Sequence, residues 1–135
     1  MKKQLIPISK FKVPKKALEN MFIQQLKFQN RFYKKELVEN LFKRPVGKRL
    51  DCLNIMLTCV IQEACEARDW LDWKPWKKTK AKWSKNTRYE FINELVDIQH
   101  FLINAAIFVG CDSKEFIRTF FNKNKENINR QRKGY

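Results

Sequence analysis

The sequence predicts an all-α protein, an antiparallel bundle of about four to five helices. Apolar residues recur at helical spacing along several long segments. Only three glycines and four prolines occur in 135 residues, so tight turns are few. Signals for helix ends accompany the apolar segments: Gly110 suits a helix C-terminus, and Asp112–Glu115 has capping-box spacing.

The chain length fits one domain with its own core, which we place at residues 15–135. Residues 1–14 are predicted to form an extended basic segment, because Pro7 and Pro14 interrupt any helix there. This segment lacks the apolar stretch of a signal peptide, and no run of 18 apolar residues predicts a membrane span. We therefore expect a cytoplasmic protein, in a bacterium or a phage-infected host cell.

The first helix is predicted from about residue 15 to 42, with a break near Tyr33. One side of it is an apolar stripe interrupted by Gln25 and Gln29. A neutral amide in such a stripe is either a core polar group with its own partners or a group that contacts a nucleotide base. Residues 44–47, Arg-Pro-Val-Gly, separate this helix from a second one at about 48–70.

Two acidic pairs lie on the second helix and on a third one, predicted from about 84–87 to Gly110. They are Glu63-x-x-Glu66 and Glu94-x-x-Asp97, and the i, i+3 spacing puts each pair on one helix face. Apolar residues surround both pairs, so we expect both helices to be largely buried. Four carboxylates meeting there need a counter-charge, which two or more Mg²⁺ or Mn²⁺ ions would supply. The alternative is a solvated face, or acids paired with Lys and Arg.

The third helix carries two stripes with different predicted roles. Glu94, Asp97, Phe101 and Asn104 form one stripe, and a separate apolar stripe is expected to face the core. The apolar stripe consists of Phe91, Leu95, Ile98, Leu102, Ala105 and Val109. His100 is interpreted either as a residue that contacts a metal ligand or as a residue of the pocket wall. Asp69, on the second helix, is either a further acid near the site or an exposed residue near the helix end.

All four tryptophans fall between Trp70 and Trp83, interleaved with lysines. Such a stretch, including Lys74, Trp76 and Lys77, suits stacking on a base and neutralisation of phosphate. The alternative is a loop whose indoles cap the core. The last helix opens at Asp112 and becomes polar from Asn122 to Tyr135, as either a frayed solvated end or a phosphate clamp.

The net charge of +15 indicates an anionic partner: nucleic acid, a membrane surface or a phosphorylated small molecule. Four cysteines without a C-x-x-C pair and a single histidine argue against a structural zinc site. The thiols are interpreted as small buried residues in a reducing cytoplasm. The sequence contains no P-loop and no arrangement for a covalent nucleophile.

The spacing of the acidic pairs resembles the E-x-x-E … E-x-x-D signature of the all-α nucleoside triphosphate pyrophosphatases, which include dimeric dUTPases and MazG-like enzymes. Three segments resemble the dimeric dUTPase-like branch common in phages, over roughly residues 18–135. They are Trp73–Lys77, Asp97–Phe101 and the ending from Lys123 to Tyr135.

The resemblance implies a homodimeric, Mg²⁺-dependent hydrolase that splits a deoxynucleoside triphosphate into monophosphate and pyrophosphate, with dUTP favoured and dCTP next. It implies that Glu63, Glu66, Glu94 and Asp97 bind the metal ions and that one of them helps to position or deprotonate water. It places Phe101 against the deoxyribose and Gln25, with Gln29, at the base. Candidates for the phosphates are Lys74, Lys77, Lys123, Asn127 and Arg130.

A different class of function also fits the composition: a basic helical nucleic-acid-binding protein without catalytic activity. It would use the Trp-Lys stretch and the Lys/Arg-rich tail, and its binding would weaken steeply with salt. The acids would then be surface or salt-bridged residues.

Overall fold

A computed structural model describes residues 16–32, 46–78 and 82–134 of the chain. Within these ranges the protein is all-helical, as the sequence predicts, and no strand occurs. The helices are α1 (Ala17–Phe32), α3 (Val46–Asp69), α4 (Lys85–Phe108) and α5 (Ser113–Arg132). The predicted extended segment 1–14 and the predicted extension of the first helix to residue 42 lie outside the described residues.

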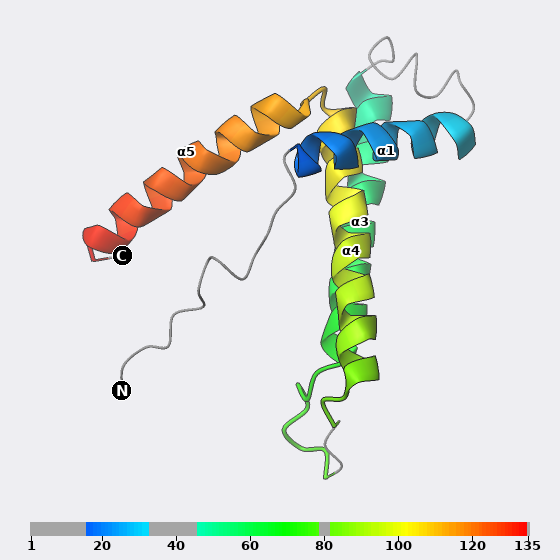
Figure 1. Cartoon of the computed structure of the whole chain (residues 1–135), viewed down its shortest axis with the longest axis vertical. Helices are drawn as coiled ribbons and strands as arrows, with labels where there is room; N and C mark the ends of the chain where they lie inside the picture. Colours follow the sequence, from blue (N-terminus) through cyan, green and yellow to red (C-terminus); the bar gives the residue numbers. More distant parts are fainter. Residues whose placement is uncertain (1–15, 33–45, 79–81, 135) are drawn as a thin grey trace.

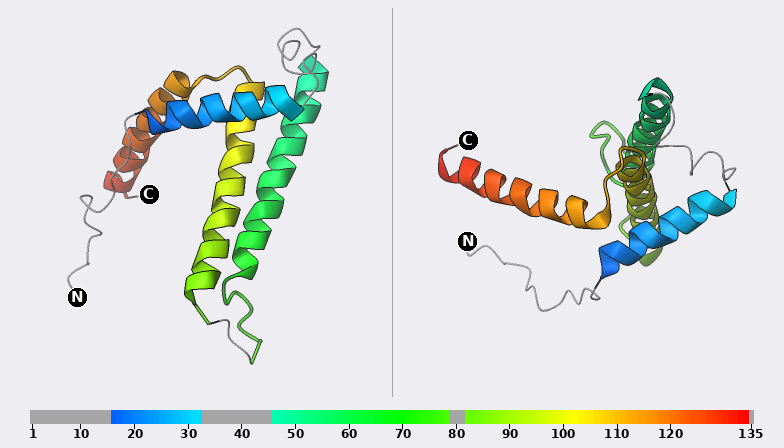
Figure 2. Two further views of the ribbon diagram at one scale, coloured as in Figure 1. Left: turned by 45° about the vertical axis from the view of Figure 1, so that its right-hand side comes forward. Right: turned by 90° about the horizontal axis from the view of Figure 1, so that it is seen from above.

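The long helices α3 and α4 form an antiparallel pair that lies side by side over most of its length (Figures 1 and 2). Each has 24 residues and is therefore roughly 36 Å long. Met56 of α3 packs against Ala105 and Phe108 of α4, with Cys52, Leu53 and Phe101 around them. This packing aligns α3 with α4 and so determines which of their side chains lie opposite one another.

The helix α1 crosses the end of this pair at which α4 finishes, and α5 leaves from there in another direction (Figure 2). Phe22 of α1 is buried with Ile103, Ala106 and Ile107 of α4, and this forms a second core cluster. The ring of Phe22 also meets Phe116 of α5 edge-on, at 5.8 Å between centroids. The core therefore sits at one end of the α3–α4 pair.

The predicted helix ends are confirmed around α4 and α5. Ser84 caps α4 and its side chain accepts a hydrogen bond from the Thr87 N–H. After α4 the chain turns through Gly110, whose φ is 82°, and the N–H of Cys111 reaches the carbonyl of Ala106. This is a Schellman motif. Asp112 then caps α5 by accepting from the Glu115 N–H at 2.8 Å.

The prediction that both acidic helices are largely buried is wrong for the single chain. Ile61 remains 66% exposed and Leu95 45% exposed, and on α4 the apolar stripe fails at Leu102 and Val109, which are also exposed. The reason is geometric: α3 and α4 cover each other along one face only, and α1 covers only one end of the pair. The side of α4 that meets α3 carries Glu94, Asp97 and Phe101, together with Ala105, the member of the predicted apolar stripe that is buried there.

None of the described helices is by itself long and apolar enough to cross a membrane. The helices α4 and α5, which are bent by 108° at their connection, pass a test of length and composition only when taken together.

Candidate functional site

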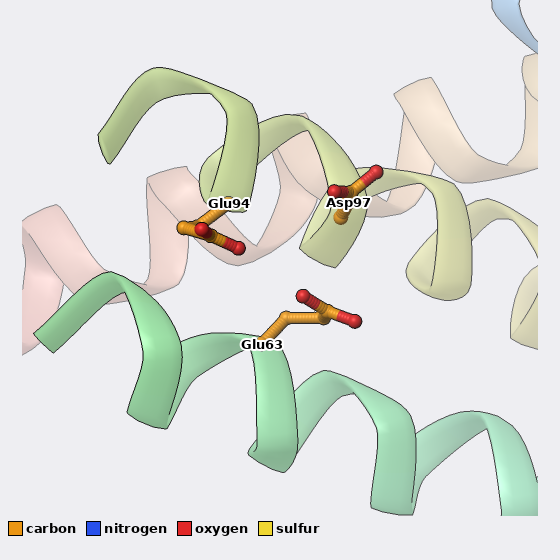
Figure 3. Close-up of side chains that lie close together, drawn as sticks. All are labelled: Glu63, Glu94 and Asp97. Atoms are coloured by element: carbon orange, nitrogen blue, oxygen red, sulfur yellow. The ribbon is translucent and has the colours of Figure 1, made fainter. Parts of the chain in front are cut away.

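Three carboxylates from two helices meet between α3 and α4 (Figure 3). Glu63 comes from α3, and Glu94 and Asp97 come from α4; each is half-buried, and one oxygen of each lies within 4.8 Å of the others. The i, i+3 spacing brings Glu94 and Asp97 to the same face, and the antiparallel register places Glu63 opposite them. We call these three residues the acidic cluster.

The electrostatics of the acidic cluster disfavour a full set of negative charges. Burial raises the pKa of Glu63, and the neighbouring charges of Glu66, Asp97 and Glu94 raise it further. A hydrogen bond from the protonated Glu63 to Glu94 acts in the same direction. A cation would relieve this repulsion, and a donor set of carboxylate oxygens alone fits hard ions such as Mg²⁺ or Mn²⁺.

The structure leaves two other acids of α3 outside this group. Glu66 is exposed, and its Oε1 accepts a hydrogen bond from Gln62 Nε2 at 2.9 Å. Asp69 is the exposed last residue of α3, and its Oδ1 accepts from Trp73 Nε1 at 2.9 Å. Asp69 thus takes the second of its two predicted roles, whereas the role of Glu66 as a metal ligand stays a prediction.

The acidic cluster receives a hydrogen bond from an indole, and the sequence does not predict this contact. Trp70 Nε1 donates to Glu94 Oε1 at 3.3 Å. The concentration of tryptophans after α3 was visible in the sequence, but nothing in their spacing pairs one of them with an acid 24 residues later.

A pocket of about 490 Å³ lies beside the acidic cluster. Its walls are Gln24, Gln25, Lys27, Phe28, Arg31 and His100. His100 connects the two sites, since its Nδ1 lies 3.5 Å from Asp97 Oδ1. His100 is therefore a pocket-wall residue, as predicted, and Gln25 faces the same space.

Gln29 is buried in α1 at 3% exposure. The sequence did not single out Lys27 and Arg31, because basic residues are frequent throughout this chain.

The loop after α3 is built around Trp73. The Arg68 guanidinium lies 4.0 Å and the Lys74 ammonium 4.6 Å from the centre of its ring. The rings of Trp76 and Trp73 form a T-shaped pair, Trp76 is itself 71% exposed, and Lys77 is exposed beside it. Trp83, although exposed, packs edge-on against Phe91.

The polar C-terminal part is helical through Arg132 and exposed, so it is a solvated end, as one of the two alternatives has it, but it is not frayed. Glu126 pairs with both Lys123 and Arg130, and the hydrogen bond from Lys123 together with the charges of Arg130 and Lys123 lowers the pKa of Glu126. Because α5 points away from the α3–α4 pair (Figure 1), one chain does not bring Lys123, Asn127 and Arg130 to the acidic cluster. Phe101 packs at the α3–α4 contact.

No protein-family model and no solved structure matches this chain. A stretch of 52 residues, 38% of the chain, is 38% identical to a dCTP pyrophosphatase of Enterobacteria phage T4. The match spans 30% of the length of that relative. The likeness is therefore confined to a minor part of both proteins.

Proposed function

We propose that this protein hydrolyses a pyrimidine deoxynucleoside triphosphate to the monophosphate and pyrophosphate, with Mg²⁺ as cofactor. The observation that carries the proposal is the convergence of Glu63, Glu94 and Asp97 from two helices, with their oxygens within 4.8 Å. The resemblance of the acidic motifs favours dUTP, whereas the relative that matches in part is named for dCTP. These two nucleotides are therefore the first substrates to test.

Each part of the proposed site has a distinct task in this reaction. Mg²⁺ bound to the acidic cluster would screen the triphosphate and make a bound water more acidic. The carboxylates of Glu63, Glu94 and Asp97 would hold the ion, and one of them would position the attacking water in line with the leaving pyrophosphate. Glu66 would join them by turning away from Gln62.

The pocket next to the acidic cluster is proposed to hold the rest of the nucleotide. Gln25 offers an amide that can donate to and accept from a base edge. Lys27 and Arg31 add positive charge to the same walls, where it would favour an anionic ligand. The contact between His100 and Asp97 joins this pocket to the acidic cluster, where the cations would hold the phosphates.

We further propose that the protein acts as a homodimer. Support comes from the exposed apolar residues of α3 and α4, which a second copy would cover. A partner chain could also supply Lys123, Asn127 and Arg130, which lie far from the acidic cluster of their own chain (Figure 1).

Pyrophosphate release from each dNTP and NTP, with and without Mg²⁺, tests the proposed reaction. We expect Mg²⁺-dependent release from dCTP or dUTP. Glu94→Ala should lower kcat by at least about 100-fold, since a lost metal ligand removes several kcal/mol of charge stabilisation. Asp51→Asn, at an exposed acid on α3, serves as the matched control and should leave the rate unchanged.

Failure to release pyrophosphate from any triphosphate, in protein that is folded by circular dichroism, would contradict the proposed reaction. A salt-dependent titration with DNA would then test the nucleic-acid-binding alternative, which the exposed Trp76 and Lys77 would serve.

A further inference from the structure

Trp70 lies where the chain leaves α3. Its backbone N–H still bonds the carbonyl of Ala67 at 3.3 Å, and its side chain reaches across to α4. There the indole Nε1–H donates to Glu94 Oε1 at 3.3 Å. The loop after α3 is thereby tied to one carboxylate of the acidic cluster.

The chemistry of an indole suits it to orient a carboxylate. An indole N–H donates one hydrogen bond and has no lone pair to offer, so it cannot compete with Glu94 for a cation. A carboxylate with one oxygen held by such a donor loses rotational freedom about its terminal bond. Groups that orient metal ligands in this way have large effects on metal affinity in other proteins.

The segment that carries Trp70 is itself braced. Trp73 Nε1 donates to Asp69 Oδ1 at 2.9 Å, and Arg68 covers the Trp73 ring at 4.0 Å. The Leu71 N–H bonds the carbonyl of Arg68 at 2.9 Å, which continues the last turn of α3. These contacts order the chain on both sides of Trp70, from Arg68 to Trp73, and so limit where its indole can lie.

We propose that Trp70 is a positioning residue, which fixes the Glu94 carboxylate in the orientation that receives a divalent cation. This inference rests on the proposed function, because it assumes that the acidic cluster binds such an ion. Trp70 touches neither the substrate nor the reacting atoms in this scheme; it acts through Glu94.

Calorimetric titration of the full chain with Mn²⁺ tests the inference, because its readout does not depend on turnover. Trp70→Phe keeps a ring and removes the N–H, and we expect it to weaken Mn²⁺ binding by about 10- to 100-fold. Trp83→Phe is the matched control, since Trp83 packs its ring against Phe91 at 5.8 Å, and its Mn²⁺ affinity should equal that of the wild type.

A second measurement uses the wild-type chain and does not require the variant to fold. The indole N–H signal of Trp70, followed by NMR during a Mg²⁺ titration, should shift and saturate, whereas that of Trp83 should stay in place. Equal Mn²⁺ affinity in wild type and Trp70→Phe, or an unmoved Trp70 signal at saturating Mg²⁺, overturns the inference alone. A wild-type chain that binds neither ion overturns the metal site of the proposed function as well.

Discussion

Within the acidic cluster, Glu63 is the residue whose pKa is raised. Burial and the charges of Glu66, Asp97 and Glu94 raise its pKa in the folded protein above the value of 4.5 that an unperturbed glutamate has. The folded state therefore holds the Glu63 proton to higher pH than the unfolded state does. The resulting stability is fully present below pH 4.5 and is lost as the pH rises through the raised pKa.

This gives a prediction for the metal-free protein. Glu63→Gln cannot ionise, so in EDTA at pH 7 it should melt at a higher temperature than the wild type. Its free energy of unfolding should also fall less between pH 4.5 and pH 7. Thermal melts followed by circular dichroism at several pH values measure both effects. Asp51→Asn, an exposed acid on the same helix, should change neither; a Glu63→Gln melt below that of wild type would contradict the prediction.

Asn104 is the polar residue that lies deepest in α4, at 4% exposure, and its Oδ1 has no hydrogen-bond partner among the described residues. An unpaired buried acceptor costs free energy, and an apolar group of similar size avoids this cost. We therefore expect Asn104→Leu to raise the free energy of unfolding by about 1 kcal/mol.

Urea denaturation measures the effect of Asn104→Leu, with the exposed Asn54→Leu as control. A variant less stable than wild type would show that Oδ1 is satisfied, by a second chain or by water. Loss of pyrophosphate release together with a gain in stability would instead indicate that the oxygen serves a ligand.

The sequence could predict these residues to different degrees. The pairing of Glu94 with Asp97 follows from the period of one helix, and so it is readable from spacing. The approach of Glu63 to that pair, and of Trp70 to Glu94, depends on the register between two helices. That register is set by the packing of Met56 against Ala105 and Phe108, which no local pattern specifies.

At the scale of the element, helix ends were the best-predicted feature, because caps act within a few residues. Asp112 and Gly110 lie where the sequence placed a start and a stop. The sequence predicts less well what each helix face packs against. It assigns the apolar stripe of α4 to the core, yet Leu95 and Val109 of that stripe are exposed. An apolar stripe predicts that a helix face is covered, but it does not predict which helix or which chain covers it.

Two glycines with positive φ form a matched pair to test: Gly110, in the turn between α4 and α5, and Gly134, after the end of α5. Gly110 and Gly134 have nearly the same backbone angle, φ of 82° and 83°, which a side chain with a Cβ disfavours by about 1–2 kcal/mol. Gly110 follows the core residues of α4, whereas Gly134 follows the exposed end of α5. Gly110→Ala should therefore lower the global free energy of unfolding by about 1 kcal/mol.

Gly134→Ala should leave the global transition nearly unchanged, since nothing lies within 4 Å of the added methyl group and the strain can be relieved by local fraying. Chemical denaturation of both variants measures the difference. Equal losses would show that α5 unfolds together with the core.

For the whole molecule, the exposure of α3 and α4, where the sequence predicts burial, bears on the oligomeric state. Two long helices that are apolar on several sides bury only one face of each in a single chain, which leaves Leu57, Ile61 and Leu95 exposed among others. Large apolar side chains left exposed in this number on α3 and α4 are candidates for a face that a partner covers. A second copy packed along α3 and α4 would resolve the discrepancy between sequence and structure.

The proposed homodimer predicts a mass of 32.8 kDa in light scattering, twice the 16.4 kDa of one chain. Ile61→Glu places a charge on a face that the partner would bury, and an unpaired buried charge costs several kcal/mol. At micromolar concentration this variant should therefore run at 16.4 kDa. Asn20→Glu adds the same charge at an exposed position of α1, outside the proposed interface along α3 and α4, and should remain dimeric. A wild-type mass of 16.4 kDa at every concentration would refute the dimer, and Lys123, Asn127 and Arg130 could then reach the acidic cluster only by movement of α5.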